Sequence, residues 1–176
     1  MSHSGPAARR SIPIRAFVEP GLVSCFFDTN VLVYVFDRAE SIKQARAQDL
    51  VTGHMTARDM VLSTQVLQEL YVTLTRKKRL GAADALEVVT TFAQERIVPA
   101  SADLVLRGLA LSQQRQLSAW DALIVQAALQ AGCTTLYSED FQNGARFDEL
   151  VVVNPFVLQA HEPVPKATHK VAHKRR

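Results

Sequence analysis

A chain of 176 residues, 48% hydrophobic and 21% charged, is long enough to bury a core and has the composition of one globular domain. No apolar run approaches the roughly 20 residues of a membrane helix, and the N-terminal MSHSGPAARR lacks the apolar segment of a secretory signal, so we expect a cytoplasmic protein without membrane contact. The formal charge of +3 comes from the two ends, because residues 21–160 hold fifteen acidic side chains against twelve basic ones.

The chain divides into a folded body and two basic ends. We expect a flexible basic extension at 1–20, one domain at 21–159 and a disordered basic tail at 160–176. A basic tail could bind nucleic acid or keep the protein soluble, and the sequence leaves both functions open.

The body alternates short apolar runs, which predict strands, with segments of helical apolar spacing. The expected strands are 23–27, 61–62, 96–99, 133–137 and 150–153, and the expected helices are 41–52, 64–79, 82–95, 103–114 and 118–130. Strands that alternate with helices indicate βαβ units. We therefore predict an α/β fold with three α/β/α layers and a mostly parallel central sheet of about five strands.

The two cysteines, Cys25 and Cys133, each lie in an apolar run that is typical of a strand. We expect buried thiols in a reducing compartment, and neither cysteine has the spacing of a zinc-binding motif.

Four acidic residues occupy positions where a parallel sheet would gather them. Asp28 directly follows the first strand in SCFFDTNVLV, and Asp140 follows the fourth in YSED. Asp121 lies in the first turn of a helix, and Glu69 lies in the helix after the second strand. Because ligands of such sheets bind outside the carboxyl ends of the strands, these residues are candidates for one site.

Each acid also has a structural interpretation. Asp121 follows Ser118 by three residues, as in a capping box, and Asp28 could form a turn that opens the next helix. The segment 138–140 could be an ordinary polar loop, and Glu69 could be a solvated helix residue. Taken singly, no residue decides between the two interpretations.

A shared site would require a cation. Two like charges about 4 Å apart at an effective dielectric constant of 20 repel by roughly 4 kcal/mol. No histidine or cysteine accompanies the acids in these motifs, so the ligands would all be oxygens, which favours Mg²⁺ or Mn²⁺ over zinc. Such ions commonly act on phosphate substrates.

The ordered set Asp28-Thr29-Asn30, Glu69 in QVLQELY, Trp120-Asp121-Ala122 and Ser138-Glu139-Asp140-Phe141 resembles the PIN-domain ribonucleases, above all the VapC-type toxins of bacterial toxin–antitoxin pairs. The resemblance covers about residues 23–154. It implies a PIN-like domain at 21–159 with Mg²⁺- or Mn²⁺-dependent cleavage of RNA. It also implies a homodimer and inhibition by a small antitoxin protein.

The resemblance also implies residue roles. Asp28 and Asp121 would be the principal metal ligands, and Glu69 and Asp140 would complete the acidic pocket; these four would form the catalytic site. Three polar residues would orient ligands or substrate: Thr29, Asn30 and Ser138. We expect the additional acid, Glu139, to point outward.

Positive groups would have to hold the RNA, because an acidic pocket repels a polyanion. The stretch 76–79, Arg-Lys-Lys-Arg, is the best candidate, although a solvated helix end explains it equally well. Trp120 could stack on a base, but a packing role is the simpler interpretation.

Two other classes of function are weaker. A haloacid-dehalogenase-like phosphatase would require an acid at position 30, which is Asn30, and a lysine near 138–141, which is absent. A receiver-like regulatory module would require a lysine after a late strand, and none lies between Arg115 and Arg146. A non-catalytic PIN-like module that binds nucleic acid or protein is the remaining alternative, and the presence of all four acids argues against it.

Overall fold

The computed structural model describes residues 23–77 and 80–157, and the expected basic extension and tail lie outside these residues. The strands are β1 (Cys25–Phe27), β2 (Met60–Ser63), β3 (Arg96–Val98), β4 (Thr135–Tyr137), β5 (Arg146–Phe147) and β6 (Leu150–Val153). The helices are α1 (Thr29–Tyr34), α2 (Ser41–Ala57), α3 (Thr64–Arg76), α4 (Ala82–Phe92), α5 (Ala102–Arg115) and α6 (Ala119–Gln130). Among the described helices, none combines the length and the apolar character that crossing a bilayer requires.

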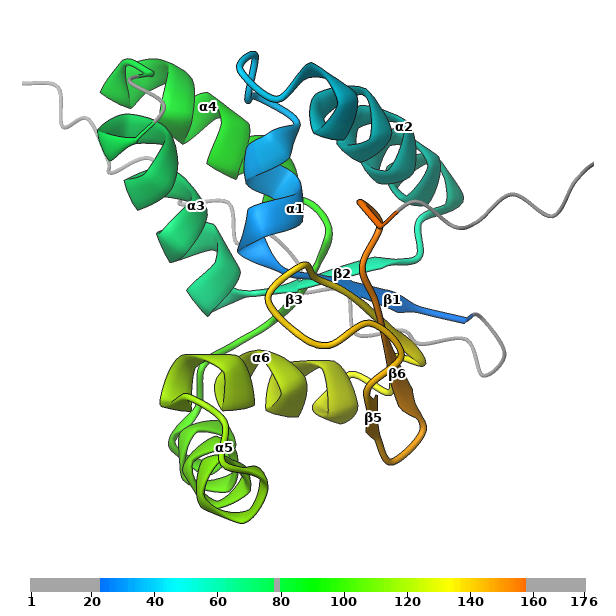
Figure 1. Ribbon diagram of the computed structural model, residues 1–176. Helices are drawn as coiled ribbons and strands as arrows, with labels where there is room; N and C mark the ends of the chain where they lie inside the picture. The colour runs from blue at the N-terminus through cyan, green and yellow to red at the C-terminus, as the bar shows by residue number, and fades with distance from the viewer. Residues whose placement is uncertain (1–22, 78–79, 158–176) are drawn as a thin grey trace, which may run out of the picture.

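The strands form one sheet in the order β3-β2-β1-β4-β6-β5. All neighbouring pairs are parallel except β5 and β6. Helices α1 to α4 cover one face of the sheet, and α5 and α6 cover the other (Figure 1). The predicted three-layer α/β/α fold with a mostly parallel sheet is confirmed.

One strand, β5, is not among those predicted from the sequence. It consists of Arg146–Phe147 alone and forms a hairpin with β6, whose turn contains Asp148 at a φ of 51°. A strand of two residues is too short to show an alternating pattern of polar and apolar side chains.

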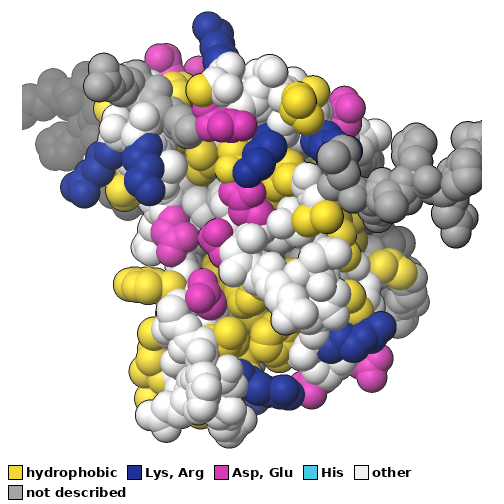
Figure 2. All heavy atoms as spheres, in the orientation of Figure 1, with side chains coloured by type: hydrophobic (Ala, Val, Ile, Leu, Met, Phe, Trp, Pro, Cys, Tyr) yellow, Lys and Arg dark blue, Asp and Glu magenta, His cyan; other side chains and the backbone are white. Residues whose placement is uncertain are grey.

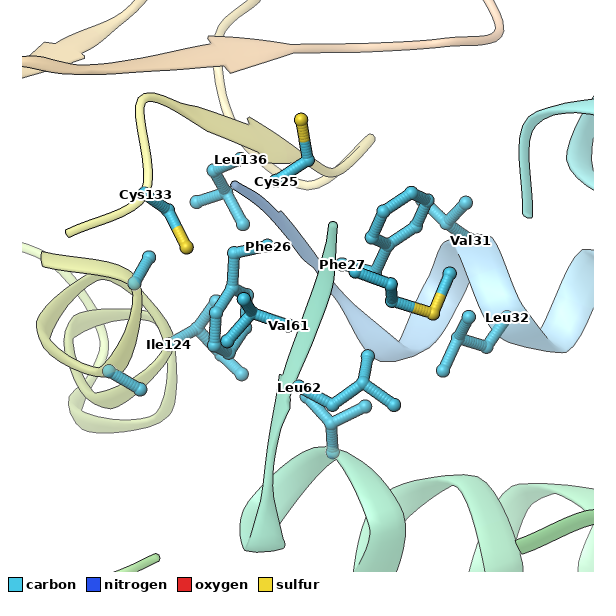
Figure 3. Packing of buried hydrophobic residues seen from close by; sticks show 14 of the residues in the cluster. Cys25, Phe26, Phe27, Val31, Leu32, Val61, Leu62, Ile124, Cys133 and Leu136 are labelled. Carbon is cyan, nitrogen blue, oxygen red and sulfur yellow. The ribbon is translucent and has the colours of Figure 1, made fainter. Parts of the chain in front are cut away.

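The central strand β1 is buried along its whole length. Phe26 lies on the side of Ile124 of α6, whereas Phe27 lies on the side of Leu32 of α1 (Figure 3). Successive side chains of a strand point to opposite faces, and both faces here are covered by helices. The apolar run before Asp28 is therefore continuous because the strand has no solvent-facing side.

Serine side chains begin three of the helices. The hydroxyls of Ser63, Ser101 and Ser118 accept hydrogen bonds from backbone N–H groups in the first turns of α3, α5 and α6. Such N-caps contribute about 1 kcal/mol each to the free energy of unfolding. They also fix where each helix starts, which determines the direction in which Glu69 and Asp121 leave their helices.

Candidate functional site

The first and fourth acidic motifs meet at the carboxyl edge of the sheet. Strands β1 and β4 are parallel neighbours, with Phe27 opposite Tyr137. The backbone N–H of Asp28 donates to the carbonyl of Tyr137 at 3.0 Å. Two segments separated by about 110 residues are thereby held side by side. This is the edge at which ligands of parallel sheets bind.

Asp28 is the buried centre of the site, with 7% of its surface exposed. Its carboxylate accepts hydrogen bonds from the Thr29 backbone N–H at 2.6 Å, from the Ser138 hydroxyl at 2.6 Å and from the Asn30 amide at 3.0 Å. Burial raises the pKa of Asp28 to about 6, although the bonds from Ser138 and Thr29 lower it, and the charges of Asp140 and Glu69 raise it further. The negative charge is therefore costly at neutral pH without a cation.

Asn30 links Asp28 to Asp140. Its amide nitrogen lies 3.0 Å from Asp28 Oδ2, 2.9 Å from Asp140 Oδ2 and 3.3 Å from Ser138 Oγ. Its amide oxygen accepts from the Glu139 backbone N–H at 3.4 Å, and the Asp140 N–H donates to Ser138 Oγ at 3.1 Å. One amide thus contacts both carboxylates and fixes their separation.

Glu69 joins the site from α3. The Thr29 hydroxyl donates to Glu69 Oε2 at 2.9 Å, and the Gln65 amide donates to Glu69 Oε1 at 3.0 Å. The Gln65 amide also lies 3.3 Å from the carbonyl oxygen of Trp120, the residue before Asp121. Gln65, which the sequence did not single out, therefore connects the second and third acidic motifs.

Asp121 is half-buried in the first turn of α6. Its backbone N–H donates to Ser118 Oγ at 3.1 Å, so the capping geometry foreseen for these two residues is present. Within the described residues, no hydrogen bond joins the Asp121 carboxylate to Asp28, Glu69 or Asp140. The structure brings these three acids together through shared hydrogen bonds. Asp121 follows Trp120, whose carbonyl accepts from Gln65, but its carboxylate is not among the described groups that line the cavity.

The expectation that Glu139 points outward is wrong. Its carboxylate accepts from the Tyr34 hydroxyl at 2.6 Å and from Lys43 Nζ at 2.6 Å. The Lys43 ammonium also lies 4.4 Å from the centroid of the Tyr34 ring and 5.3 Å from that of Phe156. Tyr34 and Lys43 thus hold the Glu139 carboxylate in place, and Phe156 packs against the same ammonium. These residues are distant along the chain, so the sequence gave no signal for the contact.

Part of this network lines a cavity of about 350 Å³. Its polar wall includes Thr29, Asn30, Glu69, Glu139 and Asp140. Several acidic side chains gather near the middle of this face (Figure 2). Lys77, at the end of α3, lines the same cavity. It belongs to the basic stretch 76–79, of which 78–79 lie outside the described residues.

The residues of this cavity fit a hard divalent cation. The side-chain groups beside Asp28 that could ligate a metal are carboxylate and hydroxyl oxygens, which suits Mg²⁺ or Mn²⁺. Burial raises the pKa of Asp28 because it disfavours the charged carboxylate, and a bound cation would favour the charged form.

Comparisons with known proteins agree with this architecture. Residues 25–149 match the sequence model of the PIN domain family. One similar solved structure is VapC20 from Mycobacterium tuberculosis, which is described as a toxin that cleaves the sarcin–ricin loop. Its sequence is 22% identical to this chain, and the structures superpose with a TM-score of 0.53. The match covers 65% of this chain and 88% of VapC20. Among curated proteins, none matches the chain.

Two solved toxin–antitoxin assemblies also share the fold. A complex from Klebsiella pneumoniae is 22% identical with a TM-score of 0.56, covering 76% of this chain and 98% of its own. VapBC2 from Rickettsia felis, bound to a DNA fragment from its promoter, is 19% identical with a TM-score of 0.51, covering 73% of this chain and 96% of its own.

Proposed function

The chain belongs to the PIN domain family, as its sequence motifs predicted, and from that membership and the acidic site we propose that it is a metal-dependent endoribonuclease. The observation that carries the proposal is the hydrogen-bonded network that links Asp28, Glu69 and Asp140 at the carboxyl edge of the sheet, where Glu69 and Asp140 line one cavity. Carboxylates this close repel one another, and only protonation or a cation relieves the repulsion.

Asp28 and Asp121 would be the principal ligands of Mg²⁺ or Mn²⁺, with Glu69 and Asp140 completing the set directly or through water. When bound, such a cation would polarise the phosphodiester group, lower the pKa of water and neutralise the charge of the leaving oxygen. The haloacid-dehalogenase-like alternative loses its basis, because the residue at its second acidic position, Asn30, is used to bridge Asp28 and Asp140.

The remaining residues of the site would position these groups. Ser138 and Asn30 each donate to Asp28 Oδ2, which fixes the direction in which the other carboxylate oxygen faces. Thr29 holds Glu69 at the cavity wall. Lys43 and Lys77 would hold the phosphate backbone of the RNA, since the cavity itself is acidic.

We also propose that the protein is the toxin of a toxin–antitoxin pair, works in the cytoplasm as a homodimer and is inhibited by a small antitoxin protein. The support is the fold shared with VapC20 and with the two toxin–antitoxin assemblies. Exposed apolar side chains on the helices, such as Leu86, Leu106 and Leu109, would suit partner contacts.

The experiment is RNA cleavage by the purified full chain with Mg²⁺, with Mn²⁺ or with EDTA. We expect cleavage with either ion and none with EDTA. Asp28→Asn and Asp121→Asn should each lower the rate at least about 100-fold without unfolding the protein. Asp49→Asn, at an exposed position of α2, is the matched control and should leave the rate unchanged.

Undiminished cleavage by both site variants would remove the nuclease assignment. RNA binding without cleavage would instead support the non-catalytic PIN-like module. Growth arrest on expression of the chain, relieved by co-expression of a small neighbouring gene, tests the toxin role separately, and light scattering of the purified protein tests the homodimer.

A further inference from the structure

A second group of possible metal ligands lies at the opposite, amino end of the sheet. Cys25 is the first residue of β1, His54 lies in the last turn of α2, and Asp59 directly precedes β2. Among the described residues, these three form a group in which one sulfur, one nitrogen and one oxygen ligand atom all lie within 4.8 Å of one another.

Backbone contacts hold the three residues in place. The Cys25 N–H donates to the Asp59 carbonyl at 2.9 Å, and the Asp59 N–H donates to the His54 carbonyl at 3.3 Å. His54 Nδ1 lies 2.8 Å from Asp59 Oδ1. The group therefore joins Cys25 of β1 to two residues near the connection between α2 and β2.

The imidazole of His54 is also fixed by aromatic neighbours. Its ring centroid lies 5.2 Å from that of Phe27 and 5.3 Å from that of Tyr137. Cys25 is buried, and about a fifth of each of the His54 and Asp59 side chains is exposed. A cation can thus reach the group from solvent, while its ligands are already ordered.

We propose that Cys25, His54 and Asp59 form a binding site for Zn²⁺, distinct from the carboxylate site. A mixed sulfur, nitrogen and oxygen donor set suits this borderline-soft ion, whereas the all-oxygen set at the other edge suits Mg²⁺ or Mn²⁺. Tetrahedral zinc with bonds of about 2.0–2.3 Å places neighbouring ligand atoms roughly 3.5 Å apart, so small side-chain movements complete the site. Water fills the fourth position.

The same three residue types could also form a thiol nucleophile with its base. Burial and the charge of Asp59 raise the pKa of Cys25 to about 11, although a hydrogen bond with Thr135 lowers it. A nucleophilic cysteine needs the opposite environment, one that lowers its pKa. The three donor atoms lie close enough together for one cation to bind them all, and such a cation would pin the end of α2 to the starts of β1 and β2.

Cobalt titration of the full, untagged chain tests the proposal, because Co²⁺ bound to a thiolate gives a near-ultraviolet charge-transfer band that carboxylates and histidines do not give. This readout matters because four of the five histidines, at positions 3, 161, 169 and 173, lie outside the described residues. We expect one equivalent of Co²⁺ to produce the band and Zn²⁺ to abolish it by displacement.

The two buried cysteines provide a matched pair of variants. Their sulfur atoms point in different directions (Figure 3). Cys25→Ala should lose the band and Cys133→Ala should keep it. No band in the unmodified protein, or a band that survives in Cys25→Ala, overturns the proposal.

Thermal unfolding gives a second test that does not require the cysteine variant to fold. Zn²⁺ at about a hundred times its Kd should raise the Tm by roughly 5–10 °C. His54→Asn should remove most of this increase, whereas Asp28→Asn should retain it. An increase that disappears in Asp28→Asn and persists in His54→Asn would assign zinc to the carboxylate site and overturn the proposal.

Discussion

The substitution Asp28→Asn should change the pH dependence of stability in a direction that the buried position dictates. In the metal-free protein the pKa of Asp28 rises from its ordinary value of 3.8 to about 6, chiefly because the carboxylate is buried. The folded protein therefore keeps the proton to a higher pH than the unfolded chain does. The stabilisation that the protonated Asp28 side chain gives to the folded state exists in full below pH 3.8 and is lost as the pH rises through about 6.

The magnitude follows from the pKa difference. Each pKa unit corresponds to about 1.4 kcal/mol, so ionising Asp28 in the folded state costs about 3 kcal/mol. The asparagine does not titrate, but its amide faces the donors of Asn30 and Ser138, which costs about 1 kcal/mol at every pH. The variant should be less stable than the original protein at pH 4 and more stable at pH 7.

Urea unfolding in EDTA, followed by far-ultraviolet circular dichroism from pH 4 to pH 8, measures both proteins. The quantity to plot is the difference between their free energies of unfolding, because the contributions of the other titrating groups cancel. We expect this difference to fall by about 3 kcal/mol between pH 4 and pH 7 and to stay constant above pH 7.

A difference that does not vary with pH would refute the inference that burial makes the Asp28 charge costly. Saturating Mn²⁺ provides an internal check. The cation should stabilise the original protein at pH 7 by compensating the carboxylates, and it should stabilise Asp28→Asn much less.

The remaining predictions concern the cavity wall and the helix packing. Lys43→Met should weaken RNA binding and make the slope of log K against log salt concentration shallower by about one. The loss of its partly exposed ion pair with Glu139 should cost no more than about 1 kcal/mol of stability. Unchanged binding in a filter assay would exclude a phosphate contact. Gly108→Ala would bring a methyl group within 2.7 Å of Leu123 Cδ2, so urea unfolding should show a loss of about 1–3 kcal/mol. Gly53→Ala, with nothing within 4 Å, is the control and should gain about 0.5–1 kcal/mol; equal effects at both positions would contradict the packing argument.

The layers of the fold could be predicted from local patterns. Apolar runs such as CFF and LVVV became β1 and β6, and the serine N-caps marked where α3 and α6 begin. These signals are local because the spacing of apolar side chains along a segment indicates which of its faces will be buried, and because a cap bonds to the first turn of its own helix. The strand β5 escaped prediction because two residues show no period.

The acidic motifs were also visible in the sequence, since Asp28 and Asp140 each follow an apolar run that had to be a strand. Strand adjacency was not visible. Only the pairing of β1 with β4 explains why the Asn30 amide touches both carboxylates, and only the path of α3 brings Glu69 to Thr29.

Contacts between segments distant in the chain were decided by the tertiary structure alone. The sequence suggested that Glu139 faces solvent, yet Lys43 and Tyr34 hold it against the cavity. It gave Cys25 no partners, yet His54 and Asp59 lie beside its sulfur. A sequence determines which residues a strand presents at its two ends, because the backbone geometry is local. Which other residues meet them depends on how helices and strands pack, and that packing is settled by the whole core at once.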